Sequence, residues 1–262
     1  MAGTELSKTR QVYLALRDRI ERGVFAREGG LPGEQALAAE LMVSRVTLRR
    51  ALAALEDEGL ISRRRGAGTF LTERGKPQPI VVDMADVMPQ LVAMGQATAV
   101  NLLEFDYVVA LPSVSEALRL DDNALVQRSV RSRRIDAKPF SYLITCVPEP
   151  IGRLFSREEL ATQPLLSLLE RAGHFADHAS QDISAELATP EIARVLEVTV
   201  GAPLIALQRV VYDRAGRGIE HLRALYRPDR YAFRMELVRR GSNALRRWEP
   251  AGQQMHMMEA AS

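Results

Sequence analysis

The chain has 262 residues, 26% charged and 47% apolar, which is the composition of an ordinary globular protein able to bury a sizeable core. Its single cysteine, Cys146, excludes an internal disulfide and fits a reducing compartment. No apolar run approaches the roughly eighteen residues that a membrane span needs, and the opening MAGTELSKTRQ lacks the apolar core of a signal peptide. We therefore expect a cytoplasmic protein without a membrane partner.

Charge is distributed unevenly along the chain, although the formal net charge is only +2. Residues 1–76 carry 14 Lys and Arg against 10 Asp and Glu, whereas the remaining 186 residues carry 21 against 23. A basic N-terminal part joined to a slightly acidic remainder indicates a polyanion-binding module attached to a different kind of domain.

The N-terminal part is predicted to contain three helices. Apolar residues at helical spacing indicate the first over residues 9–22 and the second over residues 34–41. The short connection Met42-Val43 leads to Ser44, a favourable N-cap, and to a third helix over residues 45–58. The apolar residues of this third helix that we expect to face a core are Val46, Leu48, Leu52 and Leu55.

A small hairpin follows, because LISRRRGAGTFL alternates and carries glycines at its centre. Three helices and a two-stranded wing form a winged helix-turn-helix, whose second paired helix enters the major groove of DNA. An arginine fork binds guanine or phosphate bidentately, and an arginine beside a glycine tip fits the minor groove. The residues placed to contact DNA are therefore Ser44, Arg45, Thr47 and Arg49 on the helix and the tip Arg65-Gly66 on the wing, which also carries Arg63 and Arg64.

The stretch LPGEQALAAELMVSRVTLRRALAALEDEGLISRRRGAGTFL resembles the DNA-binding domain of the GntR family of bacterial transcription regulators. The resemblance runs over about residues 9–72 and implies DNA contacts at Arg45, Thr47 and Arg49 and at the wing tip Arg65-Gly66. It implies one more contact at position 35, where the family usually has Arg and this chain has Gln35. Arg50 is left open between a phosphate contact and solvent.

Residues 72–79, TERGKPQP, are polar with glycine and two prolines, which indicates a linker, and a short helix is expected near residues 89–95. The strand-like runs beyond it are 101–109, 125–135, 140–147, 179–188, 204–213 and 218–227, with helical segments at 158–172 and 190–196. That order predicts an α+β domain around an antiparallel sheet. The expected divisions are a winged helix-turn-helix at 1–72, a linker at 73–84, the α+β domain at 85–240 and a disordered tail at 241–262.

Two sets of side chains in the second domain are candidates for ligand binding. On a strand through VQRSVRSRRID, Arg131 and Arg133 share one face, where they are costly if buried unpaired and favourable around an anion. On a strand through IEHLRALYRPDRYAF, Glu220 and Tyr226 share a face and could line a pocket. The alternative is an interstrand ion pair, such as Arg133 with Glu220, that only holds the sheet together.

The phrases VRSRRIDAKPF, LIALQRVVYD and GIEHLRALYRPDRYAF resemble the UTRA domain, the ligand-sensing domain of the HutC branch of GntR regulators, over about residues 85–236. The resemblance implies a fold similar to chorismate lyase, an anion-binding pair at Arg131 and Arg133, and ligand contacts at Glu220 and Tyr226. Sugar-phosphate sensors of this branch show Ser-x-Tyr at the middle helix, where this chain has Pro164 and Leu166, and a Glu where it has LITCVP. These departures favour a small carboxylate.

Together these features predict a ligand-responsive transcription regulator, namely a homodimeric repressor that leaves a palindromic operator when it binds a small anionic metabolite. No cofactor, catalytic residue or metal site is expected, since His174 and His178 are two histidines without further ligands. The alternatives are an enzyme with a chorismate-lyase-like fold and an effector-independent DNA-binding protein. The enzyme alternative lacks an HxxxH motif, a nucleophile elbow and a Gly-rich phosphate loop.

Overall fold

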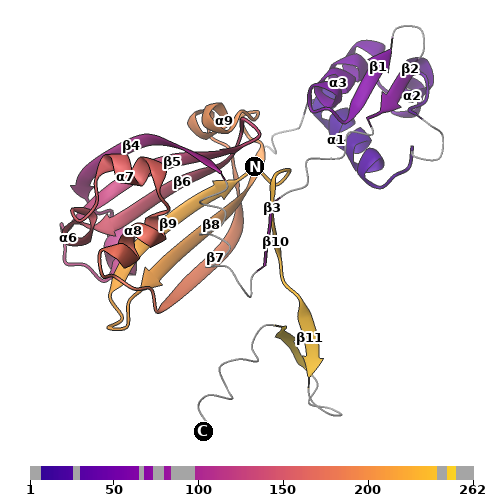
Figure 1. Cartoon of the computed structure of the whole chain (residues 1–262). Coiled ribbons are helices and arrows are strands. Elements are labelled where there is room, and N and C mark those ends of the chain that lie inside the picture. Colours follow the sequence, from indigo (N-terminus) through magenta and orange to yellow (C-terminus); the bar gives the residue numbers. More distant parts are fainter. Residues whose placement is uncertain are drawn as a thin grey trace, which may run out of the picture. The chain divides into compact units, whose positions relative to one another are not determined.

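The computed structural model describes residues 7–25, 30–64, 68–72, 80–83, 98–240 and 247–251. The chain forms two compact units, Met1–Gln78 and Pro79–Ser262, which are coloured indigo to violet and magenta to yellow in Figure 1. The predicted helix near residues 89–95 and the wing-tip residues Arg65 and Gly66 lie outside the described residues.

The first unit is the predicted winged helix-turn-helix. Its elements are α1 (Lys8–Glu21), α2 (Glu34–Glu40), α3 (Arg45–Asp57) and the antiparallel pair β1 (Ile61–Arg64) and β2 (Gly68–Leu71). Both α1 and α2 pack on α3, and the core between them includes Leu16, Leu37 and Leu52. Met42 turns the chain between α2 and α3 with a positive φ of 53°, which allows the very short connection that the sequence predicts.

The prediction that Val46 faces the core of this unit is wrong. Val46 is 62% exposed, whereas Leu48, Ala51, Leu52 and Leu55 are buried. The buried positions recur at i, i+3, i+4 and i+7, and a residue two places before Leu48 lies about 200° round the helix from it. Val46 therefore belongs to the outward face of α3.

The second unit is built on a six-stranded antiparallel sheet with the order β4-β5-β6-β9-β8-β7. The strands are β4 (Ala99–Val109), β5 (Leu125–Ile135), β6 (Lys138–Pro148), β7 (His178–Leu187), β8 (Pro203–Tyr212) and β9 (Gly218–Tyr226). All six predicted strand runs are present within a few residues of their expected bounds. Together with the first unit they give the predicted α+β architecture.

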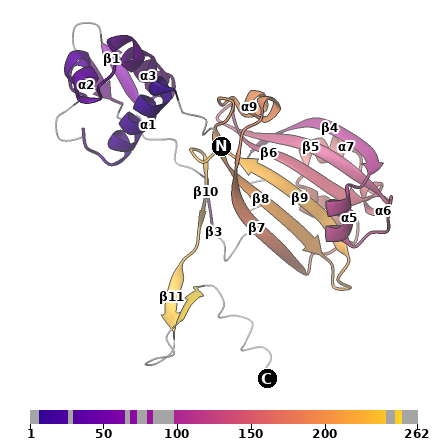
Figure 2. The same cartoon turned by 180° about the vertical axis from the view of Figure 1, so that it is seen from behind.

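Helices cover both faces of this sheet. One face packs against α6 (Glu149–Gly152), α7 (Arg157–Thr162) and α8 (Leu165–Arg171), through a core that includes Val147 and Val211. The other face packs against α5 (Pro112–Leu118) and α9 (Pro190–Leu196), through cores around Cys146 and Leu225. Figure 1 shows α7 and α8 in front of the sheet, and Figure 2 shows α5 on the opposite side.

The single helix predicted over residues 158–172 is two helices, α7 and α8. The break falls at Gln163, which is extended with φ −114° and ψ 150°, directly before Pro164. A proline ring disfavours the helical conformation of the residue before it, so the chain leaves α7 there and restarts as α8.

Two predicted boundaries of the second unit are also corrected. Ile80–Asp83, placed in the linker 73–84, forms β3, which pairs in parallel with β10 (Tyr231–Arg234). Val82 of β3 is 1% exposed and packs in a cluster with Tyr226 and Tyr231. Burial of its apolar side chain therefore stabilises β3 against the rest of the second unit. Within the tail expected to be disordered, β12 (Arg247–Pro250) pairs antiparallel with β11 (Leu237–Arg240). The strand β3 forms because it pairs with β10, about 150 residues later in the chain. The strand β12 forms because it pairs with β11, which precedes it closely in the sequence.

The role of α9 as a core element can be tested by one truncation. Leu196 is fully buried between α9 and the sheet, so Leu196→Ala should lower the free energy of unfolding by about 2–5 kcal/mol in a urea titration. Leu154→Ala is the matched control, because Leu154 is 54% exposed and its truncation should cost less than about 1 kcal/mol. Equal losses in the two variants would contradict the packing of α9.

Candidate DNA-binding surface and effector site

The N-terminus of α3 is fixed by its cap. Ser44 Oγ accepts a hydrogen bond from the Thr47 backbone N–H at 3.2 Å and lies 2.9 Å from Thr47 Oγ1. The same two residues were predicted as DNA contacts, and the structure gives them a capping role that also positions the first turn of α3. Ser44 and Arg45 are exposed on that turn, and Thr47 is half-buried.

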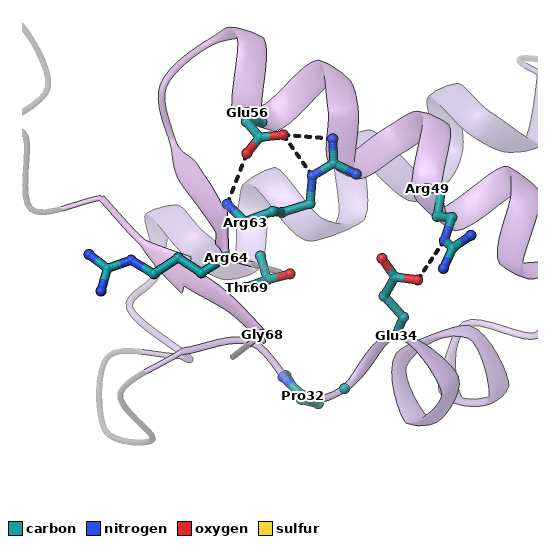
Figure 3. Close-up of a pocket in the computed structure, with 9 residues that line it drawn as sticks. Pro32, Glu34, Arg49, Glu56, Arg63, Arg64, Gly68 and Thr69 are labelled. Carbon is teal, nitrogen blue, oxygen red and sulfur yellow. Dashed lines mark hydrogen bonds and ion pairs between the residues drawn. The ribbon is translucent and has the colours of Figure 1, made fainter. Parts of the chain in front are cut away.

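Arg49 already has an anionic partner within this unit. Its Nε donates to Glu34 Oε2 at 2.7 Å, and the pair lines a hollow of about 730 Å³ between α2, α3 and the wing, as Figure 3 shows. The Arg49 side chain remains 58% exposed, so the ion pair is solvent-screened and weak. A DNA phosphate or base edge can replace Glu34 at little cost in free energy.

The described wing arginines differ in what they contact. Arg63 is bound to Glu56 through its backbone N–H at 2.8 Å and its Nε at 2.7 Å, and these bonds hold the pKa of the Glu56 carboxyl below its usual value. Arg64 extends away from that pair in Figure 3 and lies 5.6 Å from the centre of the Phe70 ring. Arg63 therefore ties the wing to α3, while Arg64 is presented outward.

The remaining predicted DNA contacts in the described residues are exposed to solvent. Gln35 is exposed in the first turn of α2, and Arg50 is exposed one position beyond Arg49. Neither Arg45 nor Arg50 forms an ion pair with a described residue. The surface formed by the start of α2 and the outward side of α3 thus carries cations that no carboxylate of the described unit neutralises.

The four predicted effector residues come together on the face of the sheet that α7 and α8 also cover. Arg131 and Arg133 lie on β5, and Glu220 and Tyr226 lie on β9, with β6 between the two strands. Their exposed fractions are 3%, 5%, 8% and 2%. Four polar side chains are therefore buried on one face, whereas the alternation of the sequence predicted only that the members of each pair share a face of their own strand.

Arg131 carries a buried charge that the described residues do not satisfy. Its Nε and Nη1 have no hydrogen-bond partner among them. Burial lowers the pKa of Arg131 to about 10; the nearby charge of Arg133 adds to this effect and Glu220 opposes it. Arg133 differs in that its Nη1 donates to Thr98 Oγ1 at 2.9 Å.

Glu220 faces two arginines, and one of them was not foreseen. Burial raises the pKa of Glu220, while the charges of Arg131 and Arg209 oppose the rise. Arg209 is 5% exposed on β8 and lies close enough to Tyr226 to lower its pKa, which burial raises. Arg209 could have been noticed in the sequence, because it shares strand parity with the apolar Leu207 and Val211. The alternative of an Arg133–Glu220 ion pair is not formed: Glu220 has no ion-pair contact with a described residue.

Aromatic rings in mutual contact form one side of the site. The Tyr226 ring stacks on Tyr231 with centroids 3.9 Å apart, and Tyr231 contacts Phe233 edge-on at 5.1 Å. Because Tyr231 and Phe233 lie on β10, the pair β3–β10 covers the end of the sheet beside Arg133. The site is thus bounded by β3–β10 at one end and by the α6–α8 layer at the other.

The two positions of the middle helix that depart from the sugar-phosphate sensors are apolar here. Pro164 is the N-cap residue of α8 and makes no side-chain capping bond, and Leu166 lies in the first turn of that helix. Neither residue supplies a hydroxyl to a sugar phosphate. In the segment LITCVP, Thr145 has a buried hydroxyl, but its Oγ1 lies 2.6 Å from Ser129 Oγ.

The remaining sequence candidates have local contacts. His178 Nδ1 lies 3.1 Å from Asp177 Oδ2, and its ring stacks on Tyr212 at 5.0 Å. Within the described ranges, no group of three or more His, Cys, Asp or Glu could hold a metal ion. Cys146 is buried, which raises the pKa of its thiol.

Comparison with known proteins decides the family. A model of the gntR family of bacterial regulatory proteins matches residues 8–71, and a model of the UTRA domain matches residues 93–232. The chain belongs to the GntR family. This GntR regulator is a HutC-like member with a UTRA domain, and the enzyme alternative is wrong because the family and the relatives are transcription regulators.

Relatives of the GntR regulator include proteins named as repressors. The HTH-type transcriptional repressor NagR of Bacillus subtilis is 26% identical over 85% of this chain and 91% of the relative. The histidine utilization repressor of Klebsiella aerogenes is 25% identical over 84% and 90%. The ligand-binding domain of a GntR-family regulator from Bordetella bronchiseptica is 28% identical, covers 54% of this chain and 91% of its own, and superposes with a TM-score of 0.51. No helix in the described part of the regulator is long and apolar enough to cross a membrane.

The DNA-binding surface of the GntR regulator is tested at Arg49. An operator duplex can be selected from a random pool, and Arg49→Ala should weaken its binding by about 1–3 kcal/mol in a gel-shift titration, because one bidentate contact is lost. The control is Arg22→Ala at the C-cap of α1, where the exposed arginine pairs with Asp18 and binding should not change. Full operator affinity in Arg49→Ala would show that α3 does not read the duplex.

The buried charge of Arg131 makes a prediction about stability. Arg131→Met should raise the free energy of unfolding of the ligand-free protein by about 1–3 kcal/mol, since an apolar side chain of similar length replaces a buried cation whose Nε and Nη1 have no hydrogen-bond partner among the described residues. The lowered pKa means that the folded state holds this proton less tightly than the unfolded chain, so the penalty is present across neutral pH and fades only as pH rises through about 10.

The control for this variant is Arg128→Met. Arg128 is on the same strand but on the other face, paired with Glu104, so its loss should bring no gain. A thermal melt at pH 7 in which Arg131→Met is less stable than the parent protein would mean that the charge is compensated.

Proposed function

We propose that this chain is a ligand-responsive repressor that binds a palindromic operator as a homodimer in the cytoplasm and is released by a small carboxylate. The observation that carries the proposal is Arg131, a buried cation without a hydrogen-bond partner among the described residues, beside a second buried arginine. Such an arrangement is unfavourable in the free protein and becomes favourable when an anion binds. An effector-independent DNA-binding protein has no need of it.

The DNA half of the proposal rests on the outward side of α3 with the wing. Arg45, Thr47 and Arg49 would read a half-site in the major groove, with Ser44 and Gln35 near the backbone and Arg65-Gly66 at the minor groove. Because one recognition helix reads only a few base pairs, affinity and specificity at an operator require two copies. NagR and the histidine utilization repressor are named repressors, which supports repression rather than activation by this chain.

The effector half rests on the cluster of Arg131, Arg133, Glu220 and Tyr226 in a domain spanning about residues 85–240. A bound anion changes DNA affinity only if it binds the DNA-competent and DNA-incompetent states with different affinities. The linker predicted from the sequence at 72–79 is the place where such a difference would act. A carboxylate is favoured over a sugar phosphate because Pro164 and Leu166 stand where sugar-phosphate sensors carry hydroxyls, and LITCVP stands where they carry a Glu.

The proposal is tested by release of DNA. A panel of small carboxylates and hexose phosphates is added to the complex of the protein with its selected operator, and at least one carboxylate should lower operator affinity by about 5-fold or more. In the double variant Arg131→Met/Arg133→Met the operator should still bind, and no carboxylate should release it.

The matched control is Arg128→Met/Arg223→Met, which removes two arginines paired with Glu104 and Glu186 on the other face of the sheet. It should respond to the carboxylate as the parent protein does. Release by hexose phosphates alone, or release that survives in the Arg131/Arg133 variant, contradicts the proposed effector class or site.

A further inference from the structure

Val46 is an apolar side chain on the outward face of α3 that neither the core nor the proposed DNA contacts use. It is 62% exposed, whereas the same helix buries Leu48, Leu52 and Leu55. At about 100° per residue, these buried positions lie on average roughly 200° round the helix from Val46. Val46 therefore stands nearly opposite the core, and packing within the described unit gives no reason for an apolar residue there.

The surroundings of Val46 are cationic. A single exposed apolar residue is common on protein surfaces, so the neighbours decide what it can contact. Arg45 directly precedes Val46, and one turn later Arg49 and Arg50 lie about 60° and 40° to either side of it. All three arginines are exposed. Val46 thus lies at the centre of a surface whose charge complements a nucleic-acid backbone.

Charge is divided along the axis of α3. The acidic residues of this helix are Glu56 and Asp57, both in its last turn. Val46 precedes Glu56 by about 15 Å along the axis, at about 1.5 Å per residue. The cationic first half of α3 therefore favours a polyanion, and the acidic far end opposes one.

The turn that carries Val46 is held in a fixed position. Ser44 Oγ caps the helix by accepting from the Thr47 backbone N–H at 3.2 Å. Valine is β-branched, and in a helix its side chain is largely confined to one rotamer. The two methyl groups of Val46 are therefore presented in one orientation, as a contact specific for shape requires.

Only one apolar group is displayed on the base edges of the major groove, the C5 methyl of thymine. The remaining groups on those edges are hydrogen-bond donors and acceptors, which an arginine can read and a valine cannot. Contact between the thymine methyl and a valine methyl removes apolar surface of both partners from water. Thymine is thus the base whose chemistry matches Val46.

We propose that Val46 reads one thymine in each half-site of the operator by contact with its C5 methyl group, beside the contacts of Arg45 and Arg49. This inference rests on the proposed function, which places α3 in the major groove. It adds a preference for thymine at one position of the half-site. Because the contact involves methyl groups alone, the preference depends on the C5 methyl and not on base pairing.

The inference is tested with the operator duplex that the parent protein selects from a random pool. Each thymine is replaced in turn by deoxyuridine in both half-sites, which removes the C5 methyl and keeps every hydrogen-bonding group. At one thymine the replacement should weaken binding of the full chain about 2–5-fold per half-site in a gel-shift titration, as expected for one buried methyl group. Val46→Ala should weaken binding to the thymine duplex by a similar factor and should bind that uracil duplex equally well.

Val24→Ala is the matched control, because Val24 is 51% exposed in the turn after α1, outside the surface formed by α2 and α3. It should keep the preference of the parent protein for thymine over uracil. Thermal melts should show Val46→Ala to be as stable as the parent, since truncation of an exposed side chain leaves no cavity and alanine is the better helix former.

Three outcomes overturn the inference. The parent protein could bind every uracil duplex as tightly as the thymine duplex, which excludes a methyl contact. A preference for thymine that survives in Val46→Ala would come from the shape of the duplex instead. A Val46→Ala protein that sediments as a smaller species than the parent without DNA would place Val46 at a contact between copies of the chain.

Failure of the inference and failure of the proposed function give different results. If Arg49→Ala weakens operator binding while no uracil duplex differs from the thymine duplex, α3 reads the operator without Val46, and only the inference fails. If Arg49→Ala keeps full operator affinity, α3 does not read the duplex, and the proposed DNA-binding surface fails together with the role of Val46.

Discussion

The buried guanidinium of Arg131 in the six-stranded sheet is the constraint on which the proposed function of this GntR regulator depends. Arg131 is held in a low-dielectric site without a hydrogen-bond partner among the described residues, which opposes folding. The surrounding sheet tolerates it because apolar layers pack at both ends of the same face and supply stability by burial. An anion that binds there offsets the free-energy cost of burying this cation, so its binding should raise the free energy of unfolding.

The two units place their arginines in different electrostatic settings. On α3 and the wing the guanidinium groups are exposed, and Arg49 and Arg63 are paired with Glu34 and Glu56. Solvent screens these pairs, so a polyanion can compete for an exposed arginine. On the proposed effector face of the sheet, Arg131, Arg133 and Arg209 are buried, and there we propose that they meet a small anion. The difference in burial would let one cationic residue type serve a large polyanion in one unit and a metabolite in the other.

Local patterns predicted much of this from the sequence. Alternation placed Arg131 and Arg133 on one face, and the N-cap at Ser44 fixed the start of α3. The break before Pro164 follows from the same local rules, although the pattern 158–172 suggested one helix. Long-range pairing was not predictable: β3 joins β10 across about 150 residues of sequence, and Arg209 reaches the site only because β8 lies next to β9. The burial that leaves an arginine without a partner is a tertiary property, visible only once the strand order is known.

We propose that anion binding in the sheet and operator binding by the N-terminal unit are linked, so that each changes the affinity of the other by the same coupling free energy. The direct measurement is the affinity of the tightest-binding carboxylate, taken by calorimetry with and without saturating operator duplex, alongside operator affinity with and without that carboxylate. Linkage requires the two ratios to be equal, and the account predicts equal ratios of about fivefold or more in the direction of mutual exclusion. An anion affinity that does not change when the operator is bound would contradict it.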